Sequence, residues 1–172
     1  MPVHMCHTVA DVIGGRIYLF GLLPTYPESY GILVFDTETQ TWEGPMTVQV
    51  IQQIRDGCLV VMAGKMYMRN FQNCYVYDPK ESKWETDEVL SSEEWENACV
   101  VNDVLYFYSW PVKELRVCGP EHKCLGVVEG LDDFLAEMRR VDRFWGVTMS
   151  NYAGKLVLFF RIQEIIGEIC CV

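Results

Sequence analysis

Cysteine, histidine and carboxylate side chains are the groups in this chain that could do chemistry. A thiol beside a histidine base is the arrangement of a nucleophilic site, and Cys6 is followed directly by His7. Neighbouring residues of a strand point to opposite faces of the sheet, so we expect this pair not to act together. The sequence has no G-x-S-x-G, phosphate loop, H-E-x-x-H or dinucleotide fingerprint, and it therefore indicates no enzyme.

The cysteines and histidines do not have the spacing of a metal site. A structural zinc ion needs four nitrogen or sulfur ligands at short paired spacings, and no C-x2-C pair occurs. We expect reduced thiols that pack as small hydrophobes, and no metal or cofactor. Cys170 and Cys171 would point to opposite faces of a strand. The cysteines are Cys6, Cys58, Cys74, Cys99, Cys118, Cys124, Cys170 and Cys171.

Carboxylates are abundant, and 24 Asp and Glu against 14 Lys and Arg give a formal net charge of -10. This charge disfavours nucleic acid and anionic membranes as partners. Six acidic residues and no basic one lie between Trp84 and Asn97, which predicts a solvated loop or, alternatively, a contact for a basic partner. Ser91 and Glu94 have the spacing of a capping box, which predicts a short helical turn there.

The elements that position these groups are repeated hairpins. Gly14-Gly15 lies between two apolar runs, and Ala63-Gly64, Asn102-Asp103 and Ala153-Gly154 occupy the same place further along. Each dipeptide suits a two-residue turn between antiparallel strands. Four such hairpins at intervals of about 40 to 50 residues indicate four-stranded blades of an all-β propeller, the last one incomplete.

The spacing between landmarks is fixed in some places and variable in others. Asp36 precedes Trp42 by six residues, and Asp78 precedes Trp84 by six. The connection between the second and third strands of each unit varies in length, and so does the connection between units. In an up-and-down sheet these variable loops all fall at one end, where binding residues are usually found.

This end supplies the candidate binding residues, because aromatic and arginine side chains are favoured anchors of protein interfaces. Each could instead fill space between sheets. The alternative function is an enzyme or small-ligand-binding protein that uses the channel of the propeller. The candidates are Tyr26, Glu28 and Tyr30 in the first loop, Arg69, Asn70 and Gln72 in the second, and Ser109 and Trp110 in the third.

One helix is predicted in the longest connection between units. Leu131, Phe134, Leu135 and Met138 follow the i, i+3, i+4, i+7 pattern of an amphipathic helix over Leu131–Arg140. We expect its apolar face to pack on the chain's own sheets; the other interpretation is that it docks to a partner.

The sequence pattern of the repeats resembles that of kelch repeats, and of plant F-box/kelch-repeat proteins in particular. The phrases that carry this resemblance are Tyr77-Asp78-Pro79 with Trp84, Glu129-Gly130-Leu131, and Asn151 to Leu156. The resemblance implies a single kelch domain of units 4–50, 51–94, 95–128 and 145–172, with 129–144 as the helical connection. It implies a protein partner, for instance a substrate of a ubiquitin ligase. Gly119 and Leu125 depart from the expected Asp and Trp.

Ring closure and location are further expectations. We expect no F-box, because the first repeat begins at His4. An unclosed propeller exposes the edges and faces of its end blades, so either the N-terminal segment completes a four-bladed ring or the chain associates with other segments, including itself through the unclosed edges. No apolar run is long enough to cross a bilayer, and the N-terminus lacks a signal-peptide pattern. We therefore expect a cytoplasmic or nuclear protein.

Overall fold

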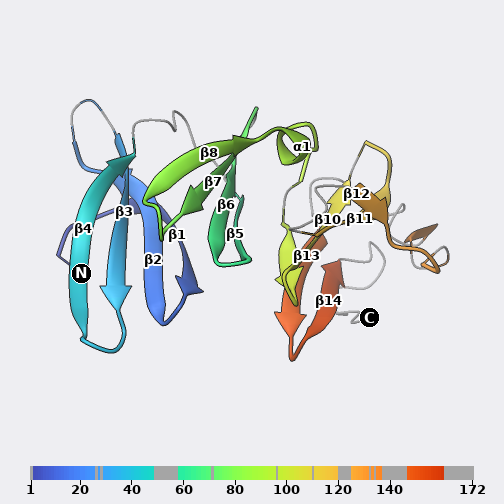
Figure 1. The fold of residues 1–172 in the computed structure, drawn as a ribbon. Helices are drawn as coiled ribbons and strands as arrows, with labels where there is room; N and C mark the ends of the chain where they lie inside the picture. The colour runs from blue at the N-terminus through green and yellow to red at the C-terminus, as the bar shows by residue number, and fades with distance from the viewer. Residues whose placement is uncertain are drawn as a thin grey trace. The chain divides into compact units, whose positions relative to one another are not determined.

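The structure is a computed structural model. It describes residues 2–25, 27, 29–48, 58–70, 72–95, 97–109, 111–119, 125–131, 133, 135–136 and 147–160. The described part of the chain forms antiparallel sheets in two compact units, Met1–Asp87 and Glu88–Val172 (Figure 1). Three sheets have four strands and one has two. The expected all-β architecture is confirmed.

The first unit contains two up-and-down sheets. Sheet 1 has the order β1-β2-β3-β4, and sheet 2 has the order β5-β6-β7-β8. The strands of sheet 1 are β1 (Cys6–Ile13), β2 (Arg16–Leu23), β3 (Ser29–Asp36) and β4 (Thr41–Val48). Those of sheet 2 are β5 (Cys58–Met62), β6 (Lys65–Arg69), β7 (Cys74–Asp78) and β8 (Lys83–Asp87).

The second unit begins with the short helix α1 (Glu88–Ser91). Sheet 3 has the order β12-β11-β10-β9, and the described part of sheet 4 is the hairpin β13-β14. The strands of sheet 3 are β9 (Cys99–Val101), β10 (Val104–Ser109), β11 (Glu114–Cys118) and β12 (Leu125–Val127). Those of sheet 4 are β13 (Val147–Tyr152) and β14 (Lys155–Phe160).

The first turn of every sheet has the same backbone. Both residues of each turn have positive φ, which is the type I′ geometry that matches the twist of paired strands. The φ angles are 56° and 78° at Gly14-Gly15, 50° and 71° at Ala63-Gly64, 51° and 59° at Asn102-Asp103, and 51° and 76° at Ala153-Gly154. The predicted four-fold recurrence of this hairpin is therefore confirmed, even where Asn-Asp replaces glycine.

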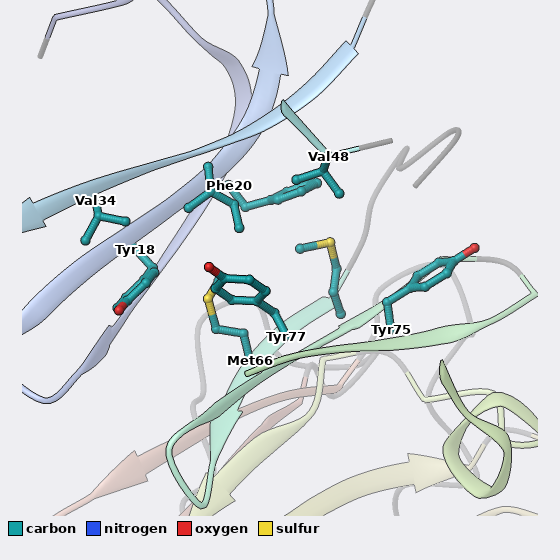
Figure 2. Packing of buried hydrophobic residues seen from close by; sticks show 9 residues of the cluster. Tyr18, Phe20, Val34, Val48, Met66, Tyr75 and Tyr77 are labelled. Carbon is teal, nitrogen blue, oxygen red and sulfur yellow. The ribbon is translucent and has the colours of Figure 1, made fainter. Parts of the chain in front are cut away.

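The two faces of each sheet have different roles. The odd face carries the residues three and five places after the second turn residue, such as Tyr18 and Phe20 in sheet 1. The even face carries those two and four places after it, such as Met66 and Met68 in sheet 2. In the first unit, the odd face of sheet 1 packs on the even face of sheet 2 (Figure 2).

The same junction recurs in the second unit. Tyr106 and Tyr108 of the odd face of sheet 3 pack with Leu156 and Leu158 of the even face of sheet 4. Asn151, next to the last turn, adds one polar contact to this junction and one within its own hairpin. Its Nδ2 donates to the carbonyl of Val100 at 3.0 Å, and its Oδ1 accepts from the backbone N of Gly154 at 3.1 Å.

The acidic segment after Trp84 differs from the predicted solvated loop. The indole of Trp95 is fully buried, and its Nε1 donates to the carbonyl of Leu90 at 3.0 Å. Glu93 forms an ion pair with Arg116 of β11 at 2.8 Å. The helix covers Glu88–Ser91, so it ends where the capping-box spacing predicted a beginning, and the Oγ of Ser92 donates to the carbonyl of Val89. Burial of Leu90 and Trp95 fixes the segment in place.

Part of the predicted helix Leu131–Arg140 lies in the described residues. The backbone N of Leu135 donates to the carbonyl of Leu131 at 2.7 Å, which is the hydrogen bond of an α-helical turn. Leu135 is buried among the residues of the sheet 3 and sheet 4 junction, with Leu131 beside it. This turn therefore packs on the chain's own core. Phe134 and Met138 lie outside the described residues.

The cysteine and histidine side chains that could be reactive are placed as follows in the described residues. Cys6, Cys74, Cys99 and Cys118 carry thiols, and burial raises the pKa of the Cys99 thiol. The Sγ of Cys6 lies 3.9 Å from Nδ1 of His4. Within the described ranges, no three His, Cys, Asp or Glu side chains are grouped as a metal site would require, and no helix is long and apolar enough to span a membrane.

Candidate functional site

The connections of the first unit are sorted between two ends. In sheet 1, the turns β1–β2 and β3–β4 meet, since the backbone N of Thr37 donates to the carbonyl of Gly15 at 3.3 Å. Tyr18 and Val34, near these turns, lie by Met66 and Tyr77, which are near the corresponding turns of sheet 2 (Figure 2). The four tight turns therefore form one end of this unit, here named the tight-turn end.

The loops β2–β3 and β6–β7 lie at the opposite end, named the long-loop end (Figure 1). Its described residues are 24–30 without 26 and 28, and 69–73 without 71. The sequence predicts that the variable connections of each sheet lie at one end, and the described loops β2–β3 and β6–β7 of the first unit do.

The β2–β3 loop is held by hydroxyl groups. The Oγ1 of Thr25 donates to the carbonyl of Pro27 at 3.0 Å and lies 2.7 Å from Oγ of Ser29. Pro24, Thr25 and Pro27 are exposed. Proline fixes its own backbone angle, so these contacts present a polar rim of limited freedom.

The β6–β7 loop is organised by one asparagine. The Oδ1 of Asn70 accepts from the backbone N of Gln72 at 3.0 Å and from that of Asn73 at 2.8 Å. Side-chain bonds of this kind fold the backbone into a compact turn. The guanidinium of Arg69 donates to the carbonyl of Asn70 at 3.1 Å, and Gln72 is exposed.

Aromatic side chains form the floor of the long-loop end. The ring of Tyr30 stacks on Phe20 with centroids 5.4 Å apart and planes 6° apart. Tyr75 belongs to the same core cluster, and its hydroxyl lies 3.4 Å from Nδ2 of Asn73. A rigid aromatic floor below amide, hydroxyl and guanidinium groups is the composition that protein interfaces favour.

The predicted site residues are therefore not equivalent. Gln72 is exposed, whereas Tyr30, Arg69 and Asn70 are half-buried and shape the loops. Ser109 is the correction to the list: it is the last residue of β10, paired with Glu114 and only 3% exposed, so its side chain is not presented to a partner. Tyr26, Glu28 and Trp110 lie outside the described residues.

Two residues of the long-loop end were missed by the sequence argument. Thr25 and Asn73 take part in the hydrogen bonds that fix the two loops. The signal for Thr25 was a hydroxyl residue four places before Ser29 in a proline-containing loop. Asn70-x-x-Asn73, at the boundary of two strands, could likewise have been interpreted as an Asx turn.

The tight-turn end has a different, purely structural electrostatic pattern. The Oδ1 of Asp36 accepts from the backbone N of Glu38 and Thr39, and the Oδ1 of Asp78 accepts from the corresponding two residues of its own turn. The second oxygen of Asp78 pairs with Lys65 at 3.0 Å, and that of Asp36 pairs with Arg16 at 3.2 Å.

These contacts lower the pKa of both aspartates below the ordinary value of 3.8. For Asp36 the main cause is the hydrogen bond from the Thr39 backbone, and for Asp78 it is the hydrogen bond from Lys65. The pKa of Lys65 is raised by the same bond to Asp78. Asp36, Asp78 and their two cations thus have a structural role in these turns, and we take the long-loop end as the candidate site.

Comparisons with known proteins agree with this architecture. The family model described as FKB95, Kelch-repeats domain, matches residues 1–172. F-box/kelch-repeat protein At4g38940 of Arabidopsis thaliana is 35% identical over 168 residues, which cover 95% of this chain and 44% of the relative. Putative F-box/kelch-repeat protein At2g21680 of the same plant is 34% identical over 171 residues, with 92% and 38% covered.

Among solved structures, that of YjhT matches with a TM-score of 0.56 at 11% identity, over 90% of this chain and 58% of YjhT. The repeated hairpins, the packing of an odd sheet face on an even one, and these matches define a kelch-repeat β-propeller or part of one. The chain belongs to the FKB95 kelch-repeats family. It spans about two fifths of the length of the curated relatives named above.

Proposed function

We propose that this chain is a non-catalytic protein-interaction module that recognises its partner through the long-loop end. The observation that carries the proposal is the contrast between the two ends of the first unit. The aspartates of the tight-turn end, Asp36 and Asp78, are engaged in their own turns and ion pairs, whereas the long-loop end presents Gln72 and the Thr25 rim above Tyr30. Variable loops on a rigid scaffold are the usual place of recognition.

We further propose that the partner is a substrate of a ubiquitin ligase. Support comes from the names of the relatives, which are F-box/kelch-repeat proteins. Resemblance to this group implies a role in presenting substrates to a ubiquitin ligase. Recognition would take place in the cytoplasm or the nucleus. The kelch domain would contribute the binding surface, and the ligase contact would lie elsewhere in the assembly.

The binding test uses the exposed residue of the site. Gln72→Ala removes an amide that contacts the partner in this proposal, and its backbone hydrogen bond to Asn70 remains. We expect partner capture from plant extract to fall at least severalfold with this variant, since the interface loses one polar contact. Glu38→Ala, an exposed change at the tight-turn end, is the matched control and should capture as the wild type does.

The two steps of the proposal fail separately. Equal capture by wild type, Gln72→Ala and the double variant Thr25→Ala/Gln72→Ala would contradict the binding site. The ligase step is tested by the abundance of the captured protein in plants that lack this chain. Accumulation of that protein supports the receptor role, and an unchanged half-life contradicts it while leaving the binding module intact.

A further inference from the structure

The first sheet has an apolar even face whose counterparts in sheets 2 and 4 are covered by another sheet. Its even face carries Ala10, Val12, Ile17, Leu19, Phe35 and Trp42. The Phe35–Trp42 ring pair on this face, with centroids 4.8 Å apart, repeats the Tyr77–Trp84 pair of sheet 2, at 4.9 Å. In sheet 2 that pair packs on sheet 1.

The even face of sheet 1 and the even face of sheet 2 carry similar residues at equivalent positions, but they differ in exposure. Val12 and Val61 both stand three places before the second turn residue of their sheets. Val61 packs in the junction of sheets 1 and 2, but Val12 is 54% exposed. Val3 and Met5 cover the half of the sheet 1 even face nearest Leu23 and Leu33. Ile17 and Phe35 remain half-buried.

A complementary face is open at the other end of the described chain. The odd face of sheet 4 carries Val157 and Phe159, both half-buried, and Tyr152. Tyr152 is 74% exposed, whereas its counterparts Ile13 and Val101 lie in the junctions of the first and second units. The junction described within each unit joins an odd face to the even face of a later sheet.

From this rule we propose that the even face of sheet 1 binds the odd face of sheet 4 of a second copy of this chain. The occupant follows from the two junctions described above, each of which joins an odd face to the even face of a later sheet. The odd face of sheet 4 carries Val157, Phe159 and Tyr152, and the even face of sheet 1 carries the Phe35–Trp42 ring pair, whose counterpart in sheet 2 takes part in such a junction. The contact is heterologous, because different surfaces of the two copies meet, and it therefore generates rings or longer assemblies. The contact uses the faces of the end sheets, which the sequence predicts to be exposed together with their edges.

The experiment measures the mass of the whole chain in solution over a range of concentrations. We expect the wild type to form assemblies whose mean mass rises with concentration. Val12→Lys and Tyr152→Lys each place a charge in one of the two faces, and each should weaken association at least tenfold. Both residues are exposed, so the melting temperature should not change when it is measured at a concentration at which the wild type is monomeric. Val127→Lys, the same change at a 49% exposed strand position, is the control and should associate as the wild type does.

Mixing the two variants tests the head-to-tail geometry. A Val12→Lys copy keeps an intact sheet 4 face, and a Tyr152→Lys copy keeps an intact sheet 1 face. The mixture should therefore form heterodimers and nothing larger, because the remaining faces both carry lysine. A wild type that stays monomeric, a variant that still assembles, loss of assembly in Val127→Lys, or a mixture that remains monomeric would each overturn the proposal. None of these outcomes depends on Gln72 or on the protein partner proposed above.

Discussion

At the scale of single residues, one aspartate organises the turn between the third and fourth strands of each sheet in the first unit. Asp78 combines hydrogen bonds to the backbone of its own turn with an ion pair to Lys65 across the sheet. In sheet 3, both partners are absent together, since Val104 and Gly119 stand where the cation and the aspartate would be. The loss of the aspartate is visible in the sequence, but the coupled loss of the cation needs the strand register.

Two substitutions separate the contributions of Asp78. Asp78→Asn keeps a side-chain oxygen for the turn and loses the ion pair, whereas Asp78→Ala loses both. Exposed ion pairs contribute little, so we expect Asp78→Ala to lower the melting temperature by about 2–4 °C and Asp78→Asn by less. Thermal unfolding followed by circular dichroism measures the difference, with the exposed turn residue Glu81→Ala as control. Equal losses for Asn and Ala would contradict a role for the turn bonds.

The same aspartates predict the acid dependence of stability. Their folded pKa values lie below the ordinary 3.8, so the unfolded chain takes up protons first as the pH falls. The stabilisation is complete above about pH 4 and is lost as the pH falls through the folded pKa values. The melting temperatures of wild type and Asp36→Asn/Asp78→Asn should therefore converge below about pH 4. A gap that widens on acidification would show that the sign is wrong.

At the scale of elements, local turn chemistry could be predicted from the sequence and burial could not. The hairpin dipeptides favour the positive φ angles of a two-residue turn. Four turns and the strands beside them can therefore be predicted from short sequence motifs. The segment Glu88–Trp95 has an acidic composition that favours solvent, yet Leu90 and Trp95 are fully buried. Ser109 illustrates the same limit, since one further β10–β11 pair takes it out of the loop. The burial of Leu90 and Trp95 depends on tertiary contacts, and the position of Ser109 depends on how far the β10–β11 hairpin is paired.

Trp95 is expected to hold the acidic segment in place. Trp95→Ala removes a fully buried ring and should lower the free energy of unfolding by about 3–5 kcal/mol. Trp95→Phe keeps most of the ring but leaves the carbonyl of Leu90 without this donor, at a cost of about 1–3 kcal/mol. Urea unfolding measures both, with Trp84→Ala, at a half-buried position, as the milder control. If the Trp95→Ala protein were as stable as the wild type, the segment would be a solvated loop and Trp95 would not hold it in place.

At the scale of the whole molecule, charge and face pattern have opposite effects on association. The net charge of -10 makes copies of the chain repel one another, whereas the proposed contact between sheets 1 and 4 joins mainly apolar side chains. The sequence predicts the repeated hairpins and the exposed end blades of an unclosed propeller. It did not show which faces are complementary, because the odd and even faces acquire their roles only from the packing of one sheet on the next.

The salt dependence of assembly follows from this balance. Screening lengths shorten from about 30 Å at 0.01 M salt to about 8 Å at 0.15 M, so added sodium chloride removes the long-range repulsion between copies. The apolar contact itself is not screened, because it depends on burial and not on charge. We therefore expect the dissociation constant of the wild-type assembly to fall as salt is raised over this range, as measured by sedimentation velocity. Val12→Lys should stay monomeric throughout. Weaker assembly at higher salt would instead identify the contact as one between opposite charges, and the sheet faces would then not be the surfaces that meet.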